Sequence, residues 1–287
     1  MMHFLIRRLL VLSLRIGSIA AVLLVLIEIG FGWLREDSIH VWNLAFSAPV
    51  SPELSPSGES AVTWVWRAFG NSVPTLLIAM LGIWMIGYGW GILGSRFRSL
   101  GASFLLRAPF GIAACFPGFW LVILISLYSY FVWERPGFAD EIRVEQGPDL
   151  VVWWNASVVA LPLILVGSSR LLRAVSSVLT DRAAETHRGA FFLLGASSEE
   201  VFYQQVCRPV RHQLAELLDR VFPLTLGGLV IVETAFHQGG IGFAFVKGIR
   251  EGSTSVVFLS AFLIACLGAI LALVRECLVY WLERRES

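Results

Sequence analysis

The deciding stretch of this sequence reads Thr186-His-Arg-Gly-Ala-Phe-Phe-Leu-Leu-Gly195-Ala-Ser-Ser-Glu-Glu200-Val-Phe-Tyr-Gln-Gln-Val-Cys207 and lies between two long apolar segments. Gly195 indicates a break between two short helices. Ser197 or Ser198 suits the start of the second helix, because a serine side chain can accept a backbone N–H there. Two glutamates follow in the first turn, where acidic side chains are favoured. We expect this polar segment to lie outside the membrane, where another protein can contact it.

The composition places the chain in a membrane. Hydrophobic residues make up 56% of it and charged residues 15%, whereas soluble domains carry about 25% charge. The mean hydropathy of +0.73 agrees with this assignment. The net charge of +1 gives no indication of a nucleic-acid partner. The four cysteines lie far apart without a CxxC pair, so we expect buried thiols and no metal site.

Apolar runs of membrane-spanning length predict an all-α membrane protein with six transmembrane helices. They cover residues 4–33, 71–94, 109–133, 150–167, 218–236 and 256–281. A signal peptide is the alternative for the first run, but the run is long and no small-residue cleavage site precedes Trp33. Pro74 fits the first turn of the second span, and Pro117 should kink the third. Close approach of another helix to the second span is expected at Gly82, Gly87, Gly89, Gly91 and Gly94.

We divide the chain at residue 70. Residues 1–70 would hold the first transmembrane helix and an external loop, and residues 71–287 a five-helix core with a cytoplasmic loop at 174–217. The orientation follows from the basic residues, because cytoplasmic loops are enriched in arginine and lysine. With both termini in the cytoplasm, sixteen basic residues fall on the cytoplasmic side and six on the outside. The stretch 186–207 is then cytoplasmic.

Three further segments carry a family resemblance: Asn71-Ser-Val-Pro-Thr-Leu-Leu, Phe116-Pro-Gly-Phe-Trp, and Val230-Ile-Val-Glu-Thr-Ala-Phe followed by Gly239-Gly-Ile-Gly. Together with the Arg-Arg-Leu-Leu start, they make the chain resemble, nearly end to end, the permease subunits of the dipeptide, oligopeptide and nickel importer group of ABC transporters. The third segment is similar to the family's Val-Val-Glu-Thr-Val-Phe and Pro-Gly-Leu-Gly run. The resemblance implies a type I ABC importer permease fold in a bacterial inner membrane.

The resemblance also implies two sets of functional residues. Gly195 would be the glycine of the cytoplasmic EAA loop, whose helix docks in a groove of an ATP-hydrolysing subunit. The ATPase-coupling residues would be Glu185, Arg188, Gly195, Ala196, Glu199 and Glu200. The gate or pathway residues would be Glu233, Thr234, Phe236, Gly240, Gly242 and Pro117.

The implied partners are a second, similar permease subunit, two ATP-binding subunits, an extracytoplasmic solute-binding protein and membrane lipid, with no nucleic acid. Peptide is the expected cargo, and nickel chelates or oligosaccharides stay open. The chain has no GxxxxGK[ST] phosphate loop, so we expect it to bind no cofactor, and ATP and Mg would belong to the partner ATPase. It also lacks HExxH and a complete nucleophile elbow, which favours a transporter subunit over an enzyme.

Two departures from the family pattern affect the loop. The residues before Gly195 are the apolar 190–194, where the family has small and charged residues, and the closing proline is Pro209 and not residue 213. One alternative is therefore a structural or assembly subunit that kept the fold but lost transport. The other is a channel or ion-coupled carrier that uses Glu233. For Glu233 itself, a gate residue and a structural carboxylate bonded to the amides of the 239–242 turn are both open.

Overall fold

The computed structural model describes residues 16–17, 60–96, 111, 118–133, 149–185 and 197–284. Apart from 16–17, the first expected span lies outside these residues. The elements within 60–284 are helical: α3 (Ala61–Arg96), α5 (Gly118–Trp133), α6 (Asp149–Glu185), α8 (Ser198–Val201), the π-helical turn η2 (Phe202–Cys207), the 3-10 turn η3 (Arg208–Val210), α9 (Arg211–Glu216), α10 (Leu218–Ala235), α11 (Ile241–Arg250) and α12 (Thr254–Arg284).

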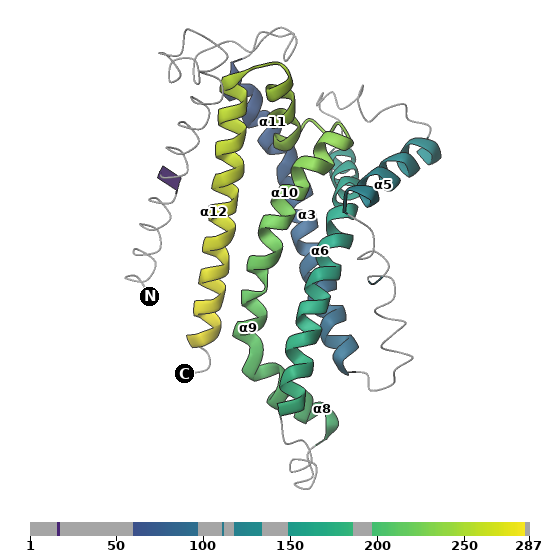
Figure 1. The fold of residues 1–287 in the computed structure, drawn as a ribbon, viewed down its shortest axis with the longest axis vertical. Helices are drawn as coiled ribbons and strands as arrows, with labels where there is room; N and C mark the ends of the chain where they lie inside the picture. The colour runs from purple at the N-terminus through teal and green to yellow at the C-terminus, as the bar shows by residue number, and fades with distance from the viewer. Residues whose placement is uncertain are drawn as a thin grey trace.

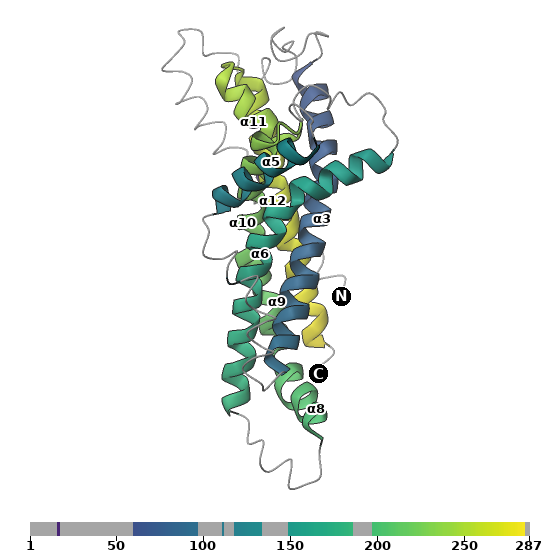
Figure 2. The same ribbon diagram turned by 90° about the vertical axis from the view of Figure 1, so that its right-hand side faces the viewer.

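Four long helices, α3, α6, α10 and α12, run side by side along the long axis of the molecule (Figure 1). Figure 2 shows α5 crossing this bundle, with α11 at the upper end and α8 at the lower end. Within the described residues, three segments are long and apolar enough to cross a membrane: Ala61–Ser95, Trp153–Asp181 and Thr254–Trp281. The expectation of a helical membrane protein is confirmed, while the count of six spans and the cytoplasmic placement of both termini stay predictions.

Glycines of the second expected span let α3 pack closely against α6. A Cβ atom built on Gly82, Gly87 or Gly91 would lie 2.7–2.8 Å from side-chain carbons of α6. Gly167 of α6 permits the same approach from the other side. The expected close approach is therefore confirmed at three glycines of α3, whereas a Cβ on Gly89 would meet open space. Backbones this close gain van der Waals contact, which drives helix association in lipid.

The buried apolar side chains of the described residues form three clusters. The largest joins α3, α5, α6, α10 and α11 and includes Val159 and Phe236. A second joins α3 to α12 around Val65 and Val256. The third, which we call the lower cluster, joins α6 to the segment 202–221. The bundle is thus held together from its upper end to the loop that closes its lower end.

Helix α3 begins earlier than the expected second span, which was to start at Asn71. It begins at Ala61, and Ser60 caps it by accepting the N–H of Thr63 at 3.3 Å. The last part of the expected external loop is therefore helical, and α3 runs across the division at residue 70. Pro74 lies inside α3, not in its first turn.

Helix α6 ends later than the expected fourth span. The span was expected to end at residue 167, just before two arginines, but the helix continues to Glu185. Those arginines lie within the helix and do not end it. Beyond them, Leu171, Val175 and Leu179 recur every four residues and stay buried in the lower cluster. Packing on this face supports the helix beyond the arginines.

Prolines and a further helix account for the remaining differences. Pro162 lies inside α6, and Figure 2 shows α6 changing direction along its length, as a proline without an N–H donor causes. The described part of the third span is α5, and the kink expected at Pro117 lies outside the described residues. The expected external loop after α10 contains α11, which buries one apolar face that includes Ile241 and Ala244.

Candidate functional site

Glu233 lies near the end of α10 and is fully buried. Its Oε2 accepts the backbone N–H of Gly242 at 2.7 Å, and the Ser72 hydroxyl and the Phe243 N–H also face the carboxyl group. Oε1 is buried and has no hydrogen-bond partner among the described residues. Because a buried carboxyl group needs such donors, the bond ties the start of α11 to α10.

Two glycines make room for this carboxyl group. A Cβ atom on Gly240 would collide with the Glu233 carboxyl group itself. A Cβ atom on Gly242 would collide with the backbone of Val230 and lie 3.0 Å from Glu233 Oε2. The turn before them holds His237 at a φ of 51°, an uncommon conformation for a residue other than glycine. The turn is therefore closely fitted to the end of α10.

Helix α3 holds the other side of the same turn. Three polar side chains in the first half of the helix bond to this turn, across more than 160 residues of sequence. The bonds run from Ile241 N–H to Ser72 Oγ (2.7 Å), from Asn71 Nδ2 to the Gly239 carbonyl (3.0 Å) and from Gln238 Nε2 to Thr75 Oγ1 (3.0 Å). We call Asn71, Ser72, Thr75, Glu233 and 238–242 the outer latch.

At the lower end, the loop between α6 and α10 begins with a capped helix. The Glu200 N–H donates to Ser197 Oγ at 3.2 Å, so Ser197 is the cap of α8, as one of the two expected serines. The chain then passes through η2 and η3 into α9 without an extended segment. The helix that the sequence predicts after Gly195 is thus confirmed, although its hydrogen-bond pattern changes within two turns.

The lower cluster ties this loop to both neighbouring helices. Leu171, Val175 and Leu179 of α6 pack with apolar residues of the loop and of α10: Phe202, Val206, Val210, Leu217 and Val221. Val175 and Val206 are fully buried. On the opposite face of the loop, Glu200, Tyr203 and Gln204 are exposed. The loop therefore has an inner face fixed to the bundle and an outer face open to a partner.

Cys207 ends η2 and packs against the lower cluster. Burial raises the pKa of its thiol to about 11. It is a free cysteine, as are Cys266 and Cys277, and the described residues contain no group of metal-ligating side chains. Cys207 is thus a packing residue of the loop.

The structure places some of the expected site residues and leaves others outside the described residues. Four expected site residues lie outside the described residues: Arg188, Gly195, Ala196 and Pro117. For two more the structure describes the backbone position, which is the end of α6 for Glu185 and α8 for Glu199. Among the expected gate residues, Glu233, Gly240 and Gly242 meet in the outer latch. Phe236 is buried in the largest cluster, and Thr234 Oγ1 donates to the Val230 carbonyl at 2.7 Å.

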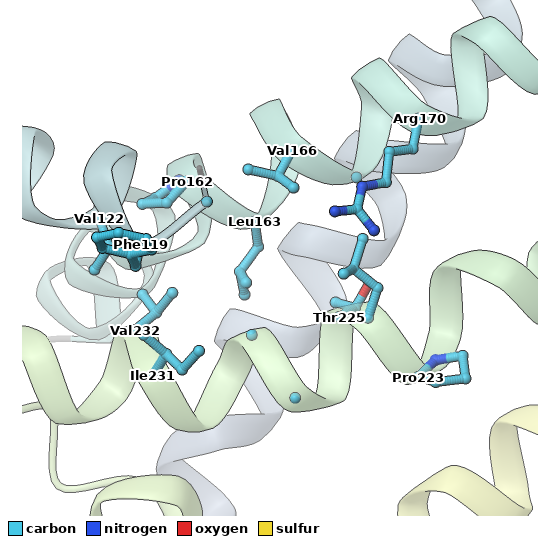
Figure 3. Close-up of a pocket in the computed structure, with 15 residues that line it drawn as sticks. Phe119, Val122, Pro162, Leu163, Val166, Arg170, Pro223, Thr225, Ile231 and Val232 are labelled. Atoms are coloured by element: carbon cyan, nitrogen blue, oxygen red, sulfur yellow. The ribbon is translucent and has the colours of Figure 1, made fainter. Parts of the chain in front are cut away.

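A pocket of about 430 Å³ lies between α5, α6 and α10, and sequence reasoning did not find it. Its walls are mostly apolar, with Phe119 and Val122 on α5, and Arg170 and Thr225 are its polar side chains. Figure 3 shows the Arg170 guanidinium directed from α6 toward Thr225 on α10. The sequence did contain one indication of this pocket: two of the apolar segments that form it each carry a proline and at least one glycine, and one of them also carries an arginine.

Comparison with known proteins gives the family. Residues 65–287 match the family described as "Binding-protein-dependent transport system inner membrane component". This range contains the outer latch, the loop between α6 and α10, and the pocket. A comparison with curated proteins gives no match. Because the family match covers well over half of the sequence, the chain belongs to the inner-membrane components of binding-protein-dependent transport systems, the permease subunits of ABC importers.

Proposed function

We propose that this permease forms half of a peptide pathway and is driven by an ATPase that docks on the loop between α6 and α10. The family membership makes it a transporter subunit and not itself an enzyme. ATP and Mg then belong to two partner ATPase subunits, and a second permease completes the pathway. A solute-binding protein delivers the cargo from outside. Peptide as cargo is supported by the resemblance at residues 71–77, 116–120 and 230–242.

The lower cluster is the observation that carries the coupling proposal. A docking loop can drive transport only if its displacement reaches the membrane helices, and packed side chains transmit displacement better than a loose connection. Val206 in the loop and Val175 in α6 are both fully buried in one cluster with Val221 of α10. Pushing the loop therefore displaces α6 and α10 together.

The distribution of charge supports a cytoplasmic position for this loop. The ends of the helices near it carry arginines, namely Arg96 of α3, Arg211 of α9, Arg220 of α10 and Arg284 of α12 (Figure 1). The excess of arginine at one membrane face is the usual mark of the cytoplasmic side. The outer latch then faces the side from which the solute-binding protein delivers its cargo.

Copurification provides the first test. The tagged chain is extracted in mild detergent, and its partners are identified by mass spectrometry. Recovery of an ATPase with a phosphate loop and a second permease supports the proposal. Recovery of the chain alone, or with unrelated membrane proteins, supports the alternative of a structural subunit and overturns the proposed coupling.

Charge reversal on the exposed face of the loop tests the docking contact. In the reconstituted complex, Glu200→Lys should reduce peptide-stimulated ATP hydrolysis and weaken ATPase recovery, because Glu200 is exposed on the loop. Glu251→Lys, the matched control, makes the same change between α11 and α12 at the other end of the bundle. Equal hydrolysis in both variants would count against docking at α8.

A further inference from the structure

We infer that the pocket between α5, α6 and α10 receives the transported substrate, with Arg170 binding a substrate carboxylate and the apolar walls receiving an adjacent apolar side chain. This inference rests on the proposed transport function and adds a ligand class and a binding residue to it. Of the expected gate residues that the structure describes, none lines this pocket. The site is therefore separate from the outer latch.

The volume and lining of the pocket fit a small amphipathic ligand. Its volume of about 430 Å³ lies in the range of roughly 300–1,000 Å³ that is typical of sites for small molecules. On the α10 wall of the pocket, no side chain projects from Gly227 or Gly228. A Cβ atom built on Gly227 would meet nothing within 4 Å. Val166 and Ile231 supply apolar surface. One apolar side chain of a peptide and its terminal carboxylate are of suitable size.

Both long helices that line the pocket contain a proline. Pro162 lies inside α6 and Pro223 inside α10, and both residues line the pocket. Each proline removes one N–H donor from its helix and so disturbs the regular hydrogen bonding of the backbone. In transporters, pairs of apolar helices interrupted by glycine or proline lie beside the substrate site. The presence of both prolines at one pocket is an independent reason to place substrate there.

Arg170 gives the pocket its ligand preference. It lies within the segment Trp153–Asp181, which is long and apolar enough to cross a membrane. Charged side chains are rare in such segments and usually face a cavity or the bundle interior. None of the described residues that line the pocket is acidic, so the lining supplies no negative charge to the Arg170 guanidinium. A planar guanidinium binds a carboxylate through two parallel hydrogen bonds. A free carboxylate is therefore the substrate group that Arg170 recognises.

The same two helices connect the pocket to the loop. α6 and α10 carry Arg170 and Thr225 on facing walls, and the lower cluster joins both helices to the segment 202–221. Displacement of the loop by an ATPase would therefore act on both walls of the pocket. Substrate affinity would then differ between the two states of the transporter, as alternating access requires.

The test measures binding to the purified complex without the solute-binding protein, so that only the permease selects the ligand. Two probe pairs are compared by calorimetry: a dipeptide ending in phenylalanine and its C-terminal amide, and 3-phenylpropionate and its amide. We expect wild type to prefer each carboxylate by about tenfold or more, since hydrogen bonds to charged groups are the stronger ones. Arg170→Gln should abolish the preference, and Arg170→Lys should restore part of it.

Arg173→Gln is the matched control, because Arg173 is exposed on the same helix and does not line the pocket. It should keep the wild-type preference. A carboxylate preference that persists in Arg170→Gln, or equal binding of acid and amide by wild type, would overturn the inference. Binding of 3-phenylpropionate with no binding of the dipeptide would refute peptide as the cargo while supporting the pocket.

A lipid headgroup at Arg170 is the competing outcome. The measurements are therefore repeated in nanodiscs of phosphatidylcholine alone and of phosphatidylcholine with phosphatidylglycerol. A carboxylate preference that is the same in both membranes supports the substrate site. If phosphatidylglycerol displaces both probes, and the displacement is lost in Arg170→Gln, the pocket is a lipid site and the inference is wrong.

Discussion

Replacing Gly242 by alanine tests whether the outer latch holds the upper end of the bundle together. The added Cβ would collide with the Val230 backbone and lie 3.0 Å from Glu233 Oε2. Backbone cannot move aside as a flexible side chain can, so α11 must shift away from α10. The shift would lengthen or break the 2.7 Å hydrogen bond from the Gly242 N–H to Glu233.

Two costs follow from this shift. Overpacking a well-packed site costs about 1–3 kcal/mol. Loss of a hydrogen bond to a buried carboxyl group costs about 1.5–3 kcal/mol. We therefore expect Gly242→Ala to lower the free energy of unfolding by roughly 3 kcal/mol or more and the Tm by roughly 6–12 °C. Glu233→Gln keeps an oxygen that can accept the Gly242 N–H, so its loss should be smaller than that of Glu233→Ala.

The assay is thermal unfolding of the purified subunit in detergent, followed by intrinsic tryptophan fluorescence. Gly70→Ala is the matched control, because Gly70 lies in α3, is exposed, and a Cβ there would meet nothing within 4 Å. In a helix this change should stabilise by up to about 1 kcal/mol. If Gly242→Ala unfolds at the same temperature as Gly70→Ala, the close fit of the outer latch is refuted.

Three further changes probe other parts of the structure. Ser72→Ala leaves the buried Ile241 N–H without its partner and should cost about 1–3 kcal/mol, whereas the exposed Ser157→Ala should leave the Tm nearly unchanged. With the other cysteines replaced by serine, Cys207 in the folded protein should react with maleimide at pH 8 about a hundredfold more slowly than in the unfolded chain. The reason is that only the thiolate reacts, and burial raises the pKa of this thiol to about 11, so the rate should rise as the pH approaches 11. Equal rates in the folded and unfolded states would contradict its burial. His237→Val should lower the Tm because a β-branched residue resists positive φ, whereas His237→Asn should preserve it.

The sequence predicts the helices best where apolar length and turn residues agree. The fifth span was expected at 218–236 and α10 covers Leu218–Ala235, because the glycines after it cannot continue a helix with ease. The fourth expected span, at 150–167, covers only part of α6, because the helix continues past two arginines to Glu185. Arginine is compatible with a helix, and the packing of Leu171, Val175 and Leu179 in the lower cluster supports α6 beyond the arginines.

The site was partly predictable for a similar reason. The sequence singled out Glu233, Gly240 and Gly242 together. It could not decide whether Glu233 is a gate residue or a structural carboxylate, because both roles predict a glutamate followed by these glycines. The hydrogen bond from Gly242 to Glu233 favours the structural role. Asn71 and Ser72 belonged to a segment that carried the family resemblance, yet their contacts with the turn join residues far apart in sequence. Such pairs follow from helix packing, which periodicity alone does not specify.

Because α6 is longer than a bilayer is thick, the tilt of this helix should depend on the thickness of the lipid bilayer. At 1.5 Å per residue, a helix from Asp149 to Glu185 extends roughly 55 Å, whereas the hydrocarbon core of a bilayer is about 30 Å thick. A thinner membrane would increase the tilt of α6, and its aqueous end would swing the loop that the lower cluster attaches to it. Lipid chain length would thereby alter the angle at which the exposed face of α8 is presented to a partner.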